Sequence, residues 1–145
     1  MKILVQRVDE ASVSVEGEKI SEIGKGLLLL VGFSKNYSEE KLEYLTKKIL
    51  KLRLWPSEKK GFDLNISDIK GELLVVSQFT LHADCSDGNK PNFTKALEYE
   101  KAEQAYEHFI AKLKNSQLHV KTGKFGAKMK VKLINNGPVT IMLER

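Results

Sequence analysis

The stretch "GLLLLVGF", residues 26–33, decides the fold because its apolar run has no polar interruption. A strand with one wet face alternates apolar and polar side chains, whereas a strand covered on both faces is apolar throughout. We therefore expect residues 26–33 to form a strand with a layer of structure on each face. Two stacked sheets and a layer of helices would provide that cover.

Two segments have the periodicity of amphipathic helices and would form the helical layer. Residues 38–53 begin with Ser38 as a candidate N-cap, and Glu39 and Glu40 place negative charge in the first turn, where it is favoured. Residues 98–114 predict a second helix with one apolar side. The apolar positions are Leu42, Leu45, Ile49 and Leu52 in the first helix and Ala102, Ala105, Tyr106, Phe109 and Leu113 in the second.

Most other segments predict strands joined by turns. Residues 2–8 and 11–16 alternate apolar and polar side chains, and a hairpin turning at Gly17 follows them. Residues 71–83 predict a long strand that becomes polar toward its end. Two final strands flank "NNGPVT", residues 135–140.

The length of 145 residues suits a single domain covering residues 1–145. Many strands and two main helices favour an α+β fold, a layered β/β/α arrangement of mostly antiparallel, barrel-like sheets. The net charge of +5 favours a polyanionic partner. No apolar run is long enough for a secretory signal or a bilayer, so we expect a cytoplasmic protein with no membrane partner.

Cys85 is the only cysteine, so no disulfide forms within the chain. Its neighbours His82, Asp84 and Asp87 must be weighed as metal ligands. Paired spacings such as CxxC or HxxxH do not accompany them, and zinc needs ligands from more than one short loop. We interpret this segment as a polar loop, and we expect neither metal nor cofactor.

Two polar motifs are candidates for chemistry. In "SQFTL", residues 77–81, a strand would project Gln78 and Thr80 to one face and Ser77 and Phe79 to the other. These side chains could equally bond the backbone where the strand ends. The second motif, "NNGPVT", is either an ordinary hairpin turn or a rigid piece of backbone with a function of its own.

With these motifs the chain resembles the D-aminoacyl-tRNA deacylase (D-tyrosyl-tRNA deacylase) family. The family's Ser-Gln-Phe-Thr and Asn-x-Gly-Pro-x-Thr motifs are matched at residues 77–80 and 135–140. "QRV" at 6–8, "GKGLLLLVG" at 24–32 and "TGKFGAKM" at 122–129 extend the match over nearly the whole chain. The resemblance implies a homodimer that hydrolyses the ester joining a D-amino acid to the 3′ terminal adenosine of tRNA.

The resemblance also implies a cis peptide bond between Gly137 and Pro138, and a turn that reaches into the partner subunit's active site. D- and L-residues exchange a hydrogen and a side chain at Cα. A backbone wall beside the hydrogen would exclude the L-form by collision, and it could not rotate away as a side chain can. Glycine has hydrogen at both positions, so we expect glycyl-tRNA to be hydrolysed as well.

The candidate catalytic residues are Ser77, Gln78, Phe79 and Thr80. Backbone N–H groups around Phe79 and Thr80 are candidate donors to the oxyanion that develops in ester hydrolysis. Thr80 could act as a nucleophile with His82 as its base. Alternatively, Thr80 only positions the ester, and the neighbouring 2′-hydroxyl of the tRNA activates or positions water. We favour the second mechanism.

Three further residues take roles from the resemblance alone. Arg7 matches an arginine that braces the Gly-Pro turn, and Phe125 and Met129 match pocket lining. Without the resemblance they would be interpreted as a surface arginine and two core residues. Gln78 is expected to contact the adenosine or the aminoacyl group.

The sequence offers two segments that could contact RNA, namely the 87–93 loop and a group of alternating lysines at residues 128–132. "DGNKPNF" departs from the family's pattern at Asp87, Lys90 and Asn92, which puts RNA contacts from this loop in doubt. The lysines at 128, 130 and 132 could compensate, or could form a solvated strand edge. Lys47, Lys48 and Lys51 lie off the apolar stripe of their helix and are expected to be solvated. A non-catalytic RNA-binding homodimer of the same fold is the alternative function.

Overall fold

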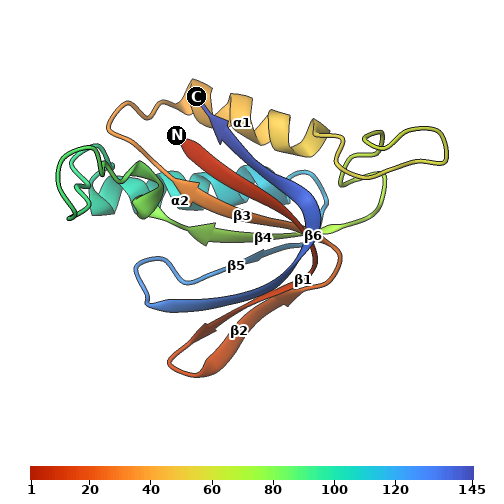
Figure 1. The fold of residues 1–145 in the computed structure, drawn as a ribbon, viewed down its shortest axis with the longest axis horizontal. Helices are drawn as coiled ribbons and strands as arrows, with labels where there is room; N and C mark the ends of the chain where they lie inside the picture. Colours follow the sequence, from red (N-terminus) through yellow and green to blue (C-terminus); the bar gives the residue numbers. More distant parts are fainter.

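The computed structural model describes all residues, 1–145 (Figure 1). Its strands are β1 (Lys2–Val15), β2 (Glu18–Ile23), β3 (Gly26–Gly32), β4 (Glu72–Ser77), β5 (Val120–Thr122) and β6 (Met129–Glu144). Its helices are α1 (Glu39–Lys51), α2 (Tyr99–Lys114) and a short 3₁₀ helix, η1 (Phe79–His82). None of these helices combines the length and the apolar character needed to cross a bilayer.

The six strands form one mixed sheet that curls over itself. Its order is β2-β1-β3-β4-β5, and β6 runs antiparallel along β1. β3, β4 and β5 are parallel, whereas β1 is antiparallel to β2, β3 and β6. Figure 1 shows the two helices over one layer of strands and a second layer, with β2 and parts of β1 and β6, on the other side. The β/β/α barrel-like prediction is confirmed, although the two layers belong to a single curled sheet.

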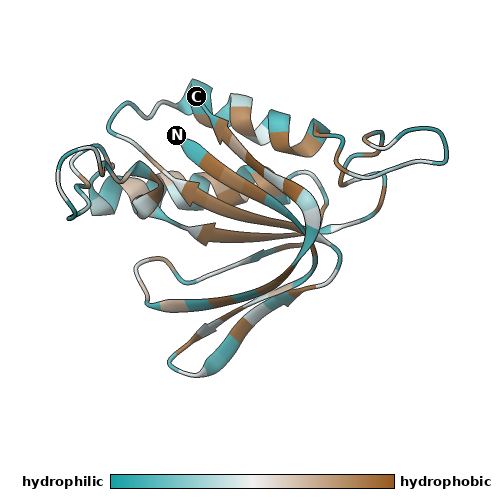
Figure 2. Cartoon of the chain, viewed as in Figure 1, coloured by the Kyte–Doolittle hydropathy of each residue, from teal (hydrophilic) through white to brown (hydrophobic).

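β3 is covered on both faces, as its apolar sequence predicts, and Figure 2 shows its continuous hydrophobic colour. Leu27, Leu29 and Val31 belong to the core shared with the helices. Leu28 lies in a smaller core between the two strand layers, together with Val13 of β1. Complete burial of a leucine side chain stabilises the fold by about 1.5–3 kcal/mol, so this strand anchors both cores.

The two helices form where the periodicity places them. Ser38 caps α1, and its hydroxyl accepts a hydrogen bond from the Lys41 N–H (3.4 Å). Leu42, Leu45 and Ile49 of α1 are buried. The buried residues of α2 are Ala105, Tyr106, Phe109 and Leu113. Both helices therefore close the larger core from one side.

The two final strands expected around "NNGPVT" are in fact one strand, β6. Thr140 pairs with Gln6 and Asn135 with Val8, so four residues of β6 lie opposite Arg7 alone. The extra residues bulge out of the ladder, and pairing with β1 resumes beyond them. Because β1 is long enough to pair with both parts of β6, the segment forms a bulge and not a hairpin.

The long strand expected over residues 71–83 is also shorter than predicted. β4 ends at Ser77, and the chain turns into η1. The Gln78 N–H still donates to the Val31 carbonyl (2.7 Å). A Cβ at Gly32 would lie 2.7 Å from the Gln78 carbonyl oxygen, so glycine at this position permits the turn to pack on the end of β3. The alternation of strand faces therefore does not extend to Thr80 and His82.

Candidate active site

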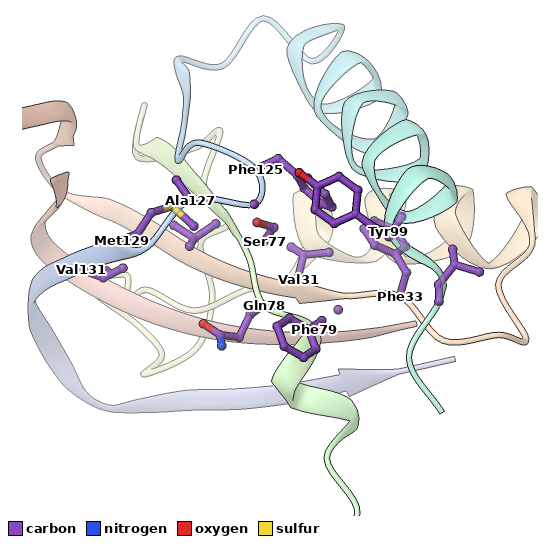
Figure 3. A pocket seen from close by; sticks show the side chains of 15 residues that line it. Val31, Phe33, Ser77, Gln78, Phe79, Tyr99, Phe125, Ala127, Met129 and Val131 are labelled. Carbon is purple, nitrogen blue, oxygen red and sulfur yellow. The ribbon is translucent and has the colours of Figure 1, made fainter. Parts of the chain in front are cut away.

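A cavity of about 470 Å³ opens at the carboxyl ends of β3 and β4, beside α2 (Figure 3). It is lined by Val31, Gly32, Phe33, Val76, Ser77, Gln78, Phe79, Leu97, Tyr99, Ala102, Phe125, Gly126, Ala127, Met129 and Val131. Eleven of these fifteen residues are hydrophobic, so the site can exclude water from a bound group. Its polar groups are the side chains of Ser77, at the end of β4, and Gln78, directly after it, and the hydroxyl of Tyr99 on α2.

The "SQFT" motif forms one edge of this cavity. Ser77, Gln78 and Phe79 line it, and Thr80 follows them on η1. Thr80 is exposed, and its hydroxyl oxygen accepts a hydrogen bond from the Gln78 side-chain amide. The amide therefore fixes the hydroxyl at the rim.

The start of η1 presents two backbone donors. The N–H groups of Phe79 and Thr80 open the 3₁₀ helix, and the first N–H groups of a helix have no carbonyl within the helix to bond. By contrast, the N–H of Leu81 bonds the Gln78 carbonyl (3.3 Å). Two free donors next to an apolar cavity can stabilise a developing oxyanion.

His82 does not form the pair with Thr80 that a continued strand would allow. Its side chain is buried, with 6% exposure, and its Nε2 has no hydrogen-bond partner. Burial lowers the pKa of this imidazole, and the nearby amino terminus and Lys2 act in the same direction, against the Gly32 carbonyl and Glu144. The 3₁₀ turn directs His82 into the protein while Thr80 stays at the surface.

A row of aromatic rings forms the opposite wall. Phe125 packs against Tyr106 at 5.5 Å between centroids and against Tyr99 at 5.2 Å. Tyr106 donates its hydroxyl to the Val75 carbonyl of β4 (2.7 Å), and burial raises the pKa of this phenol. Figure 3 shows Phe125 and Tyr99 together on one side of the cavity and Met129 on another. The structure thus places Phe125 and Met129 with the "SQFT" motif.

The remaining candidate residues, Arg7, Gly137 and Pro138, gather at a different place. The Gly137–Pro138 peptide bond is cis. The Arg7 guanidinium donates to the Asn136 carbonyl (3.2 Å), the Asn136 side-chain oxygen (2.8 Å) and the Gly137 carbonyl (3.2 Å). The Asn135 side chain donates to the Val139 carbonyl (3.1 Å). The backbone of the turn is therefore held from both sides.

This turn lies at the opposite end of the sheet from the cavity. Arg7 pairs with Leu27 near the start of β3, and the cavity lies beyond Val31 at its end. Five residues of strand span about 16 Å. This distance keeps Gly137 and Pro138 out of the cavity of their own chain, and both residues are exposed at the surface.

The 84–95 loop is organised by polar bonds. Asp84 contacts Lys95 (2.7 Å) and Ser86 (2.6 Å), and these bonds hold the pKa of the Asp84 carboxyl well below its usual range. Cys85 is free and exposed, and no group of three or more His, Cys, Asp or Glu side chains is arranged to hold a metal ion. Lys90 and Asn92 line a separate hollow beside Asp84.

The sequence does not identify several of the lining residues as part of a site, because they come from distant segments. Phe33, Leu97, Tyr99 and Ala102 belong to the loop after β3 and to the approach and first turn of α2. Tyr99 is 60% exposed, and only its place at the start of an amphipathic helix, off the buried side, could have indicated a role.

Comparisons with known proteins bear on this site. The family model described as D-Tyr-tRNA(Tyr) deacylase matches residues 4–144. A D-aminoacyl-tRNA deacylase from Listeria innocua serovar 6a is 52% identical, with 99% of this chain and 96% of the relative covered. One from Clostridium botulinum (strain Alaska E43 / Type E3) is 50% identical, with 99% and 97% covered. A solved structure described as c-Myc DNA Unwinding Element Binding Protein is 45% identical, with a TM-score of 0.94 over 100% of this chain and 99% of that one.

Proposed function

The chain belongs to the D-Tyr-tRNA(Tyr) deacylase family, and from that premise we propose that it hydrolyses the ester bond of D-aminoacyl-tRNA and rejects L-aminoacyl-tRNA by contact with the backbone of Gly137 and Pro138. The products are the free D-amino acid and tRNA. The observation that carries the proposal is an apolar cavity edged by Ser77, Gln78 and two free backbone N–H groups.

In this proposal the protein acts as a homodimer. The Gly137–Pro138 turn is exposed and lies about 16 Å along the sheet from its own cavity. A two-fold symmetric pair of chains lets each turn enter the cavity of the other subunit, because such an interface uses the same contacts twice. Each site is then incomplete without its partner.

Selection between mirror forms follows from the rigidity of the turn. Arg7 and Asn135 hold the carbonyls of Gly137 and Val139, so the main chain cannot retreat from a side chain pressed against it. A D-residue would present hydrogen to this wall and direct its side chain elsewhere. An L-residue would present its side chain and collide. Glycine presents hydrogen in either orientation, so glycyl-tRNA is also a substrate.

Hydrolysis requires water to attack the ester carbonyl while the 3′-oxygen of the ribose leaves. The N–H groups of Phe79 and Thr80 would donate to the oxyanion of the tetrahedral intermediate. The Thr80 hydroxyl has no base in contact with it, since its one hydrogen bond within the protein comes from the Gln78 side-chain amide. It acts as a positioning hydroxyl, and the substrate's 2′-hydroxyl positions or activates the water.

The test compares three esters on the same tRNA. Single-turnover release of amino acid is measured for D-tyrosyl-, L-tyrosyl- and glycyl-tRNA with the full-length protein. The proposal expects D-tyrosine and glycine to be released and L-tyrosine to stay attached. Equal rates for D- and L-tyrosine would overturn selection by the wall. If D-tyrosine is released but glycine stays attached to the tRNA, selection cannot rest only on the exclusion of L side chains.

The same assay decides the alternative, a non-catalytic RNA-binding homodimer. The solved relative described as a DNA unwinding element binding protein makes nucleic-acid binding without hydrolysis a function to be tested. A pure binding surface has no need of an apolar cavity beside free backbone donors. Binding of tRNA with no release of any of the three amino acids would favour the alternative.

A further inference from the structure

One end of α1 and the loop that follows it are rich in positively charged side chains. Residues 44–63 contain six Lys or Arg and two Asp or Glu, a net charge of +4, whereas the whole chain has +5. The exposed cations are Lys47, Lys48, Lys51, Arg53, Lys59 and Lys60, which we call the α1 basic surface. This segment is the end of α1 and the protruding loop beyond it in Figure 1.

Most of these cations have no partner in the protein. Arg53 contacts Asp63 at 3.6 Å, and the five lysines form no ion pair with a carboxylate. The last turn of a helix favours positive charge, which accounts for Lys48 and Lys51 in part. It does not account for Lys59 and Lys60, which lie on the loop.

Exposed aromatic rings lie among these lysines. Tyr44 is 45% exposed and Phe62 58% exposed. Tyr44, Lys47, Lys48, Lys51 and Arg53 line a shallow hollow of about 360 Å³, which Leu52 completes. Cations interleaved with aromatic rings are typical of surfaces that bind nucleic acid.

The lysines of β6 form a competing surface, but acidic neighbours offset their charge. Residues 9–25, in β1, β2 and the following turn, contain five acidic and two basic side chains. Lys132 lies opposite Ser12 of β1, which lies opposite Glu22 of β2. Two strand spacings separate Lys132 from Glu22 by about 10 Å, which is about one Debye length. Residues 44–63, around the α1 basic surface, contain two acidic side chains, Glu58 and Asp63, and Asp63 pairs with Arg53.

A hydrogen bond ties the α1 basic surface to the turn that inspects the substrate. Arg7 donates to the Leu54 carbonyl as well as to the Gly137 carbonyl, so one guanidinium connects the two segments. Both therefore lie at the end of the molecule away from its own cavity. In the proposed dimer that end is next to the partner subunit's cavity.

We propose that the α1 basic surface binds the phosphate backbone of the tRNA substrate. The inference rests on the proposed function, because the dimer brings this surface beside an occupied cavity. Each phosphate contact releases condensed counterions, so binding should weaken with salt in proportion to the number of lysines engaged. The surface contributes affinity for tRNA and takes no part in the chemistry.

The test compares two lysine triples on two substrates. Lys47→Gln/Lys48→Gln/Lys51→Gln should lower kcat/KM for D-tyrosyl-tRNA at least tenfold at low salt. The slope of log Kd for uncharged tRNA against log salt should fall by about 2 to 3, since each phosphate contributes about 0.7 to 0.9. Hydrolysis of the D-tyrosyl ester of adenosine, which has no backbone to bind, should be unchanged. The matched triple Lys128→Gln/Lys130→Gln/Lys132→Gln should behave as wild type.

A second variant keeps the test independent of the stability of α1. Lys59→Gln/Lys60→Gln alters only the loop, and we expect its salt slope to fall by about 1 to 2. An unchanged slope and kcat/KM in both α1-surface variants would overturn the inference, as would loss of affinity in the β6 triple instead. Failure of the proposed function gives a different result, because the wild-type protein would then release D-tyrosine from neither substrate.

Discussion

The guanidinium of Arg7 donates a hydrogen bond to the carbonyl oxygen of Gly137 (3.2 Å), across 130 residues of sequence. It does so because the bulge of β6 lies opposite Arg7, so that the Arg7 side chain contacts the backbone of the bulged residues. Arg7 is 9% exposed, and its other donors reach Asn136 and Leu54. One buried cation thus fixes the turn that we propose as the wall against L-residues.

Replacing Arg7 by lysine should weaken selectivity more than activity. Lysine keeps the charge but cannot hold Asn136, Gly137 and Leu54 at once, because it lacks the planar fork. We expect hydrolysis of L-tyrosyl-tRNA to rise at least tenfold relative to D-tyrosyl-tRNA, with a stability loss of about 1.5–3 kcal/mol. Paired single-turnover assays and urea unfolding measure the two effects. An unaltered L to D ratio would show that the turn does not need this brace.

Replacing Thr80 by alanine should lower the rate of hydrolysis by no more than about tenfold, since one positioning hydrogen bond is worth about 0.5–1.5 kcal/mol. A 2′-deoxy terminal adenosine should reduce the rate far more with wild-type protein. Single-turnover rates at saturating protein separate both effects from binding. Complete loss with Thr80→Ala and intact tRNA binding would instead identify Thr80 as a nucleophile.

His82 should make the protein less stable in mild acid. Burial lowers its pKa in the folded state, so the unfolded chain takes up a proton first as the pH falls. The stabilising contribution is complete above about pH 6.5, the ordinary histidine value, and is lost between there and the lowered pKa. The slope in that window can reach about 1.4 kcal/mol per pH unit.

Urea unfolding of wild type and His82→Gln between pH 5 and 7.5 measures this linkage. The substitution removes the titrating group, so the slope from pH 6.5 downward should flatten. Lys2 and Glu144, the charged side chains that act on His82, remain in both proteins. The same slope in both proteins would assign the acid sensitivity to other groups.

Tyr106→Phe should cost about 0.5–1.5 kcal/mol and leave the cavity intact. The substitution removes the hydrogen bond to the Val75 carbonyl, which retains its bond from the Gly123 N–H (2.9 Å) and is not left unpaired. Tyr44→Phe, on the exposed face of α1, serves as the control and should change stability little. A loss above about 3 kcal/mol for Tyr106→Phe would mean that the hydroxyl also holds the aromatic wall in place.

The sequence predicts the elements of this fold well because burial and helix capping are local signals. The run at residues 26–33 identifies the central strand, and Ser38 identifies the start of α1 within one residue. Each signal depends on neighbours within one or two turns. The layered arrangement follows from them, since β3 needs cover on both faces.

The deviations arise where tertiary packing overrides local pattern. Residues 135–140 contain turn chemistry, yet β6 continues through them because β1 offers pairing partners on both sides. Thr80 and His82 would share a face on a strand, but the chain leaves β4 at Ser77 and turns into η1, and Gly32 permits this turn to pack on the end of β3. In both cases the partner, β1 for residues 135–140 and Gly32 for Gln78, is far away in the sequence.

The candidate site divides in the same way. Ser77, Gln78 and Phe79 and the pair Phe125 and Met129 come from motifs, and the structure places both groups on one cavity. The walls from Phe33, Leu97 and Tyr99 depend on how α2 packs over the sheet, and no short pattern encodes that.

The most direct test of the central claim is the L to D ratio of a mixed dimer. One subunit carries Ala127→Trp, which fills its cavity, and retains the native turn. The other retains its cavity and carries Pro138→Gly, which loosens its turn. Single-turnover release is then measured for L- and D-tyrosyl-tRNA, with a Pro138→Gly homodimer as the control. If the turn acts across the interface, the mixed dimer will cleave the D-ester and reject the L-ester like wild type, whereas L-cleavage at the level of the control would show that each chain's turn serves its own site.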